Sequence, residues 1–532
     1  MTDETTAPET DESSGDTRLA LLLAAAMFVL VVDTSMMNVS ISAVIEDLDT
    51  TASGVQGAIA LEALVSAAFI LISSKVADLI GRKLAYVLGL LAYAVGAISM
   101  TLTQSLLPIY IFWAITGGLG ASLMLPAMQA LIHGNFTGAA QKRVYALVGA
   151  ATGIAAAVGP LIGGFITTYL SWRIGFLLEV VIIAVVLSGI KLVKDVPYTG
   201  DKRIDFGGAI FSVVGMGGVV LGILVWQEGG DRVLALIALG LVALVALGFW
   251  LVRRKKAQKV TLLDPDLLRS ANFRCGLSGQ MLQQISLGGL MIVLPLFLQM
   301  VLAYDAMKAG LSMAPLSLSM FALALYMGKR AGDRRPAAII RAGFALLFVG
   351  IAMLLPFVPR VEHGWQLFAP LIIAGAGFGL LMSQLNNYTL APVSEERISE
   401  AAGVNSASGS FGLSFGLAMA GGVMLAVLSF SFTNQTNDSD IIPADDKVAI
   451  ADALEEDAQV MSDSHVESLI VNEPFEVQAE VLEINDDARS LGLQAGLLVP
   501  LIAALLGLLT SFRMMRLPDI KPSAAVEGMI GG

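Results

Sequence analysis

Residues 18–44 read RLALLLAAAMFVLVVDTSMMNVSISAV, an apolar run with a single carboxylate, Asp33, near its middle. A helix needs about 20 apolar residues to cross the hydrocarbon core of a bilayer, so this run is long enough to span one. Asp33 lies fifteen residues beyond Arg18, the nearest basic residue, and a charge at the centre of a membrane helix costs about 2.5–3.5 kcal/mol on insertion scales. The stretch therefore predicts a membrane protein with a polar pathway, in which Asp33 is a functional residue.

The composition of the whole chain agrees with a membrane protein. Of its 532 residues, 56% are hydrophobic and 14% are charged, against about 25% charged in soluble domains. The single cysteine, Cys275, excludes an internal disulfide and a cysteine-based metal site. The chain has no nucleotide-binding loop that would indicate ATP drive. We therefore expect no enzyme, no catalytic residue, no cofactor, no metal and no nucleic-acid partner.

Apolar runs between charged breaks predict fourteen membrane spans. The third and fourth runs are separated only by Thr103-Gln104-Ser105, which is the weakest division in the count. The predicted spans are 18–44, 54–76, 84–103, 107–132, 142–170, 173–193, 205–227, 231–252, 272–302, 307–330, 336–357, 365–391, 400–431 and 490–516.

The distribution of basic residues predicts the orientation. With both termini in the cytoplasm, the inner loops and tails hold 26 of the 32 Lys and Arg residues, as the positive-inside rule requires. We expect a multi-pass protein of the bacterial cell (plasma) membrane, with residues 1–17 and 517–532 as cytoplasmic tails, the first of them disordered. Residues 1–17 lack the pattern of a cleavable signal peptide.

Two cytoplasmic loops indicate an internal repeat. The loop after the second span carries Asp78 followed by Arg82 and Lys83, and the loop after the tenth span carries Asp333 followed by two Arg residues. Parallel six-helix repeats are a known transporter plan with the substrate site between them. We therefore predict an all-α polytopic fold with a first half at 18–193, an inserted helix pair at 205–252 and a second half at 272–516.

Three motifs carry a resemblance to a known family. The loop at 74–83 reads SKVADLIGRK, the fifth span contains GPLIGG at 159–164, and the first span contains VDTSMMNVS at 32–40. These are similar to the loop pattern G-x-L-A-D-R-x-G-R-K, to the antiporter signature of the fifth helix and to the first-helix pattern L-D-x-T-x-x-N-V-A-L-P. Over residues 18–516 the chain resembles the major facilitator superfamily, in its fourteen-helix drug:proton antiporter branch.

The resemblance implies a gating role for two of these motifs. The loop residues Asp78, Gly81, Arg82 and Lys83, together with Asp333 of the equivalent second loop, would act as a latch between the halves. The alternative is a positive-inside loop with no gating role. In the fifth span, small residues four apart allow close helix approach and proline bends a helix. The resemblance assigns a conformational role to the residues of this signature, while ordinary tight packing is the alternative. The residues concerned are Gly159, Pro160, Gly163 and Gly164.

The chain departs from the family pattern in its membrane charges. Ala114 and Gly117 stand in the fourth span where the family has an Arg and a Gln, and that Arg is tied to proton coupling in the family. Glu62 and Glu179 are additional membrane carboxylates. Together with Asp33 they predict an acid-lined cavity that exchanges protons; the alternative for Glu62 and Glu179 is that both face water near the outer surface.

Uncharged polar residues complete the candidate site. Polar side chains in membrane spans either line a cavity or bond to neighbouring helices, and the sequence does not separate these roles. Trp113 either stacks on substrate or belongs to the aromatic belt at the membrane surface. The selected candidates for substrate or proton contact are Asn38, Trp113, Gln283, Gln299 and Asn386.

The segment 432–489 is predicted to be an acidic extracytoplasmic loop. It has sixteen acidic residues against Lys447 and Arg489, a net charge of −14, and this loop accounts for the chain's net charge of −12. One helical stripe runs from Val448 to Met461, and Pro474 begins a second helix that continues into the last span. We expect 433–489 to be a lid or a dock for an extracytoplasmic partner; the alternative is a disordered spacer.

Three functions are compatible with these features. The leading prediction is a secondary active exporter of amphipathic, hydrophobic compounds of the multidrug type, coupled to proton antiport and acting as a monomer. The second is a lipid or glycolipid exporter of the same fold that uses the acidic loop as its lid or carrier dock. The third, a non-transporting membrane scaffold or sensor, fits Asp33 and the fifth-span signature less well. The partners would be the lipid bilayer, protons and a small amphipathic substrate or a lipid.

Overall fold

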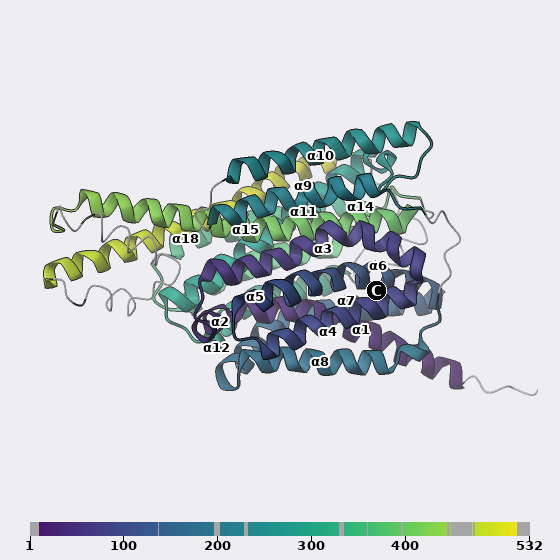
Figure 1. Cartoon of the computed structure of the whole chain (residues 1–532), viewed down its shortest axis with the longest axis horizontal. Helices are drawn as coiled ribbons and strands as arrows, with labels where there is room; N and C mark the ends of the chain where they lie inside the picture. The colour runs from purple at the N-terminus through teal and green to yellow at the C-terminus, as the bar shows by residue number, and fades with distance from the viewer. Residues whose placement is uncertain are drawn as a thin grey trace, which may run out of the picture.

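The computed structural model is a bundle of long helices (Figure 1). It describes residues 10–136, 138–195, 203–227, 232–328, 335–358, 360–394, 397–443, 447, 471 and 474–518. Within these residues, fourteen helices are long and apolar enough to cross a membrane, and none of the residues lies in a strand. The predicted all-α fold with fourteen spans is confirmed, including the division at Thr103, where α4 ends and a new helix begins at Leu106.

The first six spans account for the helices up to η2. Their bounds are α1 (Thr10–Val39), α2 (Ile41–Leu48), α3 (Ala52–Ile80), α4 (Arg82–Leu102), α5 (Leu106–Pro108), η1 (Ile109–Gly117), α6 (Gly118–Asn135), α7 (Gly138–Tyr169), α8 (Trp172–Ser188) and η2 (Ile190–Leu192). Of these, η1 is a π-helix. The helix α1 begins at Thr10, inside the tail that the sequence predicts to be disordered.

The remaining spans follow a pair of helices in the middle of the chain. The pair is α9 (Phe206–Gln227) and α10 (Val233–Lys256). After it come η3 (Pro265–Arg269), α11 (Ala271–Leu296), η4 (Phe297–Val301), α12 (Ala306–Gly328), α13 (Pro336–Phe357), η5 (Gly364–Leu367), α14 (Phe368–Leu390), α15 (Ile398–Asp438) and α18 (Phe475–Arg516).

Two long seams join the first six spans to the last six. On one seam α7 packs along α12, and on the other α3 packs along α15. The second seam includes a buried hydrogen bond from the Ser414 hydroxyl to the Ala60 carbonyl, at 2.6 Å. The helix α9 lies over this seam in contact with both α3 and α15, whereas α10 packs chiefly on α9 and forms the edge of the bundle (Figure 1).

The helices α15 and α18 are longer than their predicted spans and extend together beyond the others (Figure 1). Pro474 caps α18, which confirms the predicted helix start and its continuation into the last span. The apolar stripe of that helix is buried, with Val477, Val481 and Ala488 at most 4% exposed. This burial explains why residues 475–489 of α18 are helical although they lie beyond the predicted membrane span. The predicted stripe from Val448 to Met461 lies outside the described residues, apart from its flanks.

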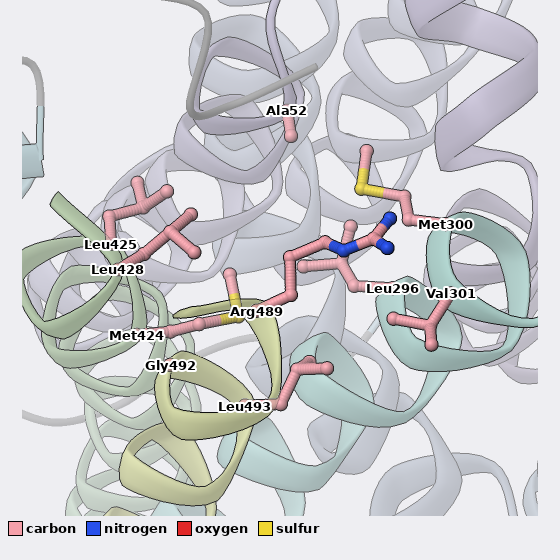
Figure 2. Close-up of a pocket in the computed structure, with 10 residues that line it drawn as sticks. All are labelled: Ala52, Leu296, Met300, Val301, Met424, Leu425, Leu428, Arg489, Gly492 and Leu493. Atoms are coloured by element: carbon pink, nitrogen blue, oxygen red, sulfur yellow. The ribbon is translucent and has the colours of Figure 1, made fainter. Parts of the chain in front are cut away.

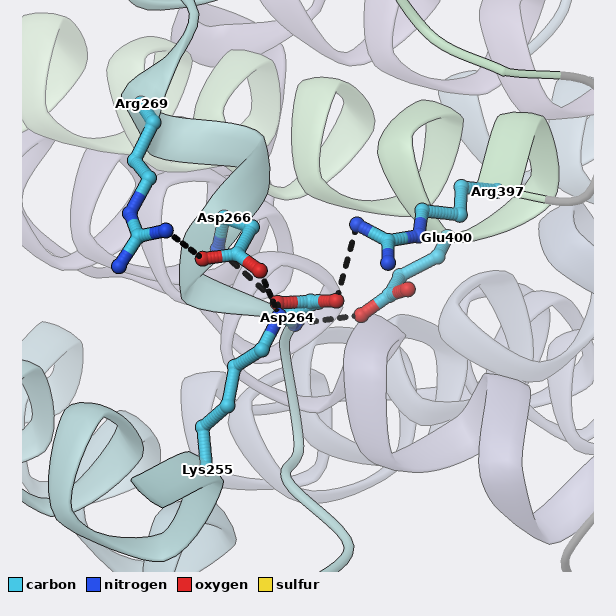
Figure 3. A network of polar contacts seen from close by, with 6 residues as sticks. All are labelled: Lys255, Asp264, Asp266, Arg269, Arg397 and Glu400. Atoms are coloured by element: carbon cyan, nitrogen blue, oxygen red, sulfur yellow. Dashed lines mark hydrogen bonds and ion pairs between the residues drawn. The ribbon is translucent and has the colours of Figure 1, made fainter. Parts of the chain in front are cut away.

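An ionic network ties the end of α10 to the start of α15 (Figure 3). The Lys255 ammonium donates to the carboxylates of Asp264 and Asp266, while Arg397 pairs with Asp264 at 3.0 Å. The Glu400 carboxylate accepts from the Asp264 amide at 2.6 Å. Burial opposes the charged form of Asp264, but the hydrogen bonds and the two neighbouring cations outweigh it and hold the pKa of that carboxyl below its usual range.

Candidate functional site

A central cavity of about 340 Å³ lies between the two sets of helices. Its lining residues come from α1, α3, α6 and α7 on one side and from α11, α12, α14 and α15 on the other. Most of the lining is apolar, and four methionines contribute to it: Met27, Met291, Met320 and Met382. The polar contributors are Thr34, Ser35, Asn38, Glu62, Ser66, Thr152, Gln284, Ser317 and Ser410. Glu62 is the only ionisable residue among the described residues that line it.

Asp33 is held behind this cavity by two aromatic donors. Its side chain is 1% exposed and accepts hydrogen bonds from the Tyr93 hydroxyl and from the Trp113 indole N–H, at 3.1 and 3.3 Å to its two oxygens. Hydrogen bonds to a charged group contribute about 1.5–3 kcal/mol each, so these donors offset much of the cost of placing the carboxylate in the membrane.

The position of Trp113 depends on an unusual helix. Trp113 lies in η1, where the π-helical turn is wider than an α-helical turn, and such segments occur often at functional sites. The side chain is 2% exposed and does not line the cavity, so it is neither in a surface belt nor in contact with the cavity. Ala114, which stands where the family has an Arg, is fully buried beside it.

Glu62 and Glu179 are both buried, so neither faces water at the outer surface. Glu62 is 8% exposed and opens into the cavity. Glu179 is 2% exposed, and neither of its oxygens has a hydrogen-bond partner among the described residues. Both interact electrostatically with Asp33, and Tyr93 interacts with all three carboxylates. The three acids and Tyr93 therefore form one cluster, here called the acid cluster.

The predicted uncharged residues are divided between cavity and scaffold. Asn38 lines the cavity; its amide nitrogen donates to the Thr34 carbonyl at 2.8 Å, and its oxygen is unbonded among the described residues. Gln283 is buried and does not line the cavity, whereas its neighbour Gln284 does. The side-chain oxygen of Gln299 accepts from the Ser42 amide at 3.3 Å, outside the cavity.

Asn386 also lies outside the cavity. Its side-chain oxygen accepts a hydrogen bond from the Asn405 amide, at 3.0 Å, which joins α14 to α15. Tyr93, which the sequence analysis did not single out, is placed at the centre of the acid cluster. The sequence signal for Tyr93 is weak, since a tyrosine in an apolar span is compatible with any buried or belt position.

The loop between α3 and α4 is held within the first six spans. Gly81 has a φ of 101°, a conformation that favours glycine, and Asp78 pairs with Arg82 at 3.4 Å. The Lys83 amide donates to Asp195 at 3.0 Å, and its ammonium donates to the Val193 carbonyl at 2.7 Å. These bonds join the loop to the segment that follows α8. Asp333, of the second loop, lies outside the described residues.

The Gly-Pro signature lies on α7 where that helix contacts two partners. A Cβ on Gly159 would come within 2.5 Å of Ser35 Cβ on α1, and one on Gly163 would come within 2.9 Å of the Met36 backbone. On the opposite side, a Cβ on Gly164 would come within 2.5 Å of the Ala306 carbonyl on α12. Pro160 lies inside α7 against Gly310 of α12. The signature thus places α7 tightly between α1 and the α12 seam.

A second, small pocket lies at the base of the α15–α18 extension (Figure 2). It has a volume of about 50 Å³, and its walls are apolar apart from Arg489. Figure 2 shows the Arg489 side chain reaching from α18 toward Leu296 and Met300. Arg489 is 7% exposed and pairs with Asp486 at 3.4 Å. Among the described residues, no cluster of His, Cys, Asp and Glu has the arrangement of a metal site.

The described residues form fourteen membrane-length helices, and a central cavity lies between two sets of four of them, which is typical of a polytopic helical membrane transporter. A model of the Major Facilitator Superfamily matches residues 23–207 and 202–417. The chain belongs to that superfamily.

Individual relatives are distant but cover most of the chain. The chain is 25% identical over 416 residues to a probable actinorhodin transporter of Streptomyces coelicolor, covering 76% of this chain and 72% of that protein. It is 26% identical over 421 residues to the multidrug resistance protein Stp of Mycobacterium tuberculosis, covering 78% and 77%. A bacterial homologue of the human lysosomal transporter Spinster, solved inward-facing and unoccupied, has a TM-score of 0.61 at 12% identity and covers 97% of this chain and 100% of that one.

Proposed function

We propose that this protein is a secondary active exporter of amphipathic, hydrophobic compounds, driven by proton antiport. The observation that carries the proposal is the central cavity, which is apolar except for a few polar groups and a single carboxylate, Glu62, in front of the buried Asp33. Methionine side chains adapt their shape to different partners, so a cavity with four of them suits a range of hydrophobic compounds. Relatives that are named as multidrug resistance and actinorhodin transporters support this class of substrate.

Proton coupling is proposed through carboxylates alone. Exchange of protons for substrate requires a group that binds a proton in one conformation and releases it when substrate binds in another. Glu62 can meet a cationic substrate directly, while Asp33 can bind or release a proton behind it and affects Glu62 through their electrostatic interaction. Ala114 leaves the cluster without the membrane Arg of the family pattern, so the charge balance depends on the three acids and on Tyr93.

The test is transport by the purified full-length protein in proteoliposomes with an imposed pH gradient. Cationic dyes, neutral hydrophobic compounds and fluorescent phospholipids are supplied separately. Uptake of dyes that follows the gradient and collapses with a protonophore supports the proposal. Gradient-independent equilibration contradicts proton antiport, and movement of phospholipid alone would replace the substrate class with lipids.

The same proposal includes the orientation and the acidic segment. Both termini face the cytoplasm of a bacterial cell in this proposal, so the extension of α15 and α18 is extracytoplasmic and acts as a lid or partner dock above the exit side. Two features support an ordered element rather than a spacer. One is the small pocket that Arg489 lines at the base of the extension, and the other is the buried apolar stripe of α18. Replacing residues 436–472 with a short Gly/Ser linker should leave the fourteen spans assembled and lower export of the physiological substrate; undiminished export would favour the spacer.

A further inference from the structure

A second large cavity lies at the end of the bundle where α3 and α10 end and α9 begins. Its volume is about 590 Å³, and it shares no lining residue with the central cavity. The residues that matter for its chemistry are Leu79, Arg203, Phe206, Arg254, Lys259 and Val260. This end of the bundle also carries Arg18, the α3–α4 loop and Arg516, and the sequence analysis places it at the cytoplasmic surface.

The lining of this cavity is strongly basic. Arg203, Arg254 and Lys259 contribute three positive charges, and none of the described lining residues is acidic. The buried carboxylate of Asp205 pairs with Arg254 at 3.4 Å. The described lining therefore presents basic side chains and no acidic one.

Arg254 is fixed in place rather than mobile. Its Nε donates to the Val260 carbonyl at 2.8 Å, and its guanidinium lies over the Trp250 ring at 5.6 Å. Asp205 is itself held by the Trp250 indole N–H and the Leu262 amide, at 3.0 and 3.2 Å. A guanidinium held in one position has already lost the freedom that binding would otherwise cost, and it matches a phosphate group in geometry.

Apolar side chains border the basic residues. Phe206 is 71% exposed and Leu79 is 39% exposed, at the first turn of α9 and the last turn of α3. These positions correspond to the membrane boundary of their spans. A ligand that meets both features has a phosphate anion and an attached hydrocarbon chain. Basic cavities between membrane helices on the cytoplasmic side suit anionic lipid headgroups.

We propose that this cavity binds the phosphate-bearing headgroup of an anionic phospholipid from the adjacent leaflet. The phosphate contacts Arg203, Arg254 and Lys259, and the acyl chain lies along Phe206 and Leu79. A lipid in this position joins the end of α3, directly before the Gly81 loop, to the α9–α10 pair. The inference concerns a lipid that stays bound to the protein and does not depend on which compound is exported.

The test measures lipid binding to the full-length protein by native mass spectrometry during titration with phosphatidylglycerol, phosphatidylcholine or inorganic phosphate. The variant is Arg203→Ala with Lys259→Ala. The control is Arg253→Ala with Lys256→Ala, which removes the same charge from exposed positions of α10 that do not line the cavity. Each basic residue near an anionic lipid contributes about a fivefold gain in affinity. Phosphatidylglycerol binding should therefore weaken about 25-fold in the variant and less than about twofold in the control.

Three outcomes would overturn the proposal: equal losses in variant and control, no loss in the variant, or displacement of phosphatidylglycerol by inorganic phosphate at equal concentration. The last result would identify a soluble phosphate as the ligand. The Arg203→Lys, Lys259→Arg variant keeps the charge and should retain binding. If the double alanine variant melts below the assay temperature, Lys259→Ala alone removes one exposed side chain. It should then give about a fivefold loss, and an unchanged affinity would reject the site.

Discussion

The two walls of the central cavity are each built from four helices, yet they differ in charge. The wall from α1, α3, α6 and α7, here called the acidic wall, presents Glu62 and Asn38 and has Asp33 and its aromatic donors behind it. The wall from α11, α12, α14 and α15, here called the neutral wall, presents Gln284, serines, leucines and methionines, and no ionisable residue among those described. In the proposed mechanism, proton chemistry would belong to the acidic wall, and the neutral wall would supply shape and hydrogen bonds.

If this division is correct, the two walls communicate through their seams. The α7 helix contacts α1 through Gly159 and Gly163, and contacts α12 through Gly164 and Pro160. In the proposed mechanism, α7 is therefore the element through which a change around Asp33 would move the neutral wall.

The largest effect is expected for Asp33→Asn. Asparagine keeps the size and can still bond to Tyr93 and Trp113, but it cannot exchange a proton. One proton moving through a potential of about 100 mV supplies about 2.3 kcal/mol, which can support roughly a fiftyfold gradient of a neutral substrate. Accumulation in proteoliposomes should fall from that level to about onefold, while exchange down a substrate gradient persists. If the Asp33→Asn variant still accumulates substrate against its gradient, another residue couples proton movement to transport and Asp33 is not the coupling residue.

A smaller loss of transport activity is expected for Gly159→Leu, which tests the close contact between α7 and α1. The new side chain would collide with Ser35 and separate α7 from α1; overpacking of this kind costs about 1–3 kcal/mol. Turnover should fall about tenfold if the lost energy acts on the conformational change. Gly149→Leu, on the same helix, is the matched control because nothing lies within 4 Å of its added Cβ, and it should retain turnover within about twofold.

The result is decided by comparing turnover with thermal stability in both variants. Lost turnover at near-normal stability supports a conformational role for the signature. A variant that only melts earlier, with normal turnover for the folded fraction, would show that Gly159 serves packing alone.

Glu62→Gln and Glu179→Gln distinguish direct contact with the substrate from an electrostatic effect on Asp33 within the acid cluster. Glu62 lines the cavity and Glu179 does not. Glu62→Gln should lower export of cationic compounds relative to neutral ones by about tenfold, because a desolvated charge-assisted contact is lost. Glu179→Gln should leave this ratio unchanged and shift the pH profile of transport, since it acts on Asp33 only through its charge. Identical profiles for both variants and the wild type would remove these acids from the mechanism.

The span count and the motif helices could be predicted because both depend on local sequence. Fourteen apolar runs are visible without any partner, and Pro474 marks the start of α18 in the sequence itself. The side of a helix that meets the cavity depends on packing, and all-round apolar helices carry little periodic signal. This explains why Gln283 was selected although its neighbour Gln284 lines the cavity. The π-helical η1 shifts the register of the fourth span, so the contact between Trp113 and Asp33 could not be predicted from a 3.6-residue period.

Gln284→Leu is expected to have the smallest effect, and it tests whether the neutral wall contributes more than shape. A hydrogen bond between uncharged groups contributes about 0.5–1.5 kcal/mol net, so the apparent affinity for substrates with hydrogen-bonding groups should fall about two- to tenfold. Cationic substrates without hydrogen-bonding groups should bind with unchanged or slightly higher affinity, because leucine adds apolar surface. The control is Gln283→Leu, one residue away and buried outside the cavity; it can alter stability but should leave the affinity ranking intact. If Gln284→Leu instead changes the pH profile or abolishes accumulation, the neutral wall takes part in coupling. The division of the cavity into a proton-responsive wall and a shape-giving wall would then be wrong.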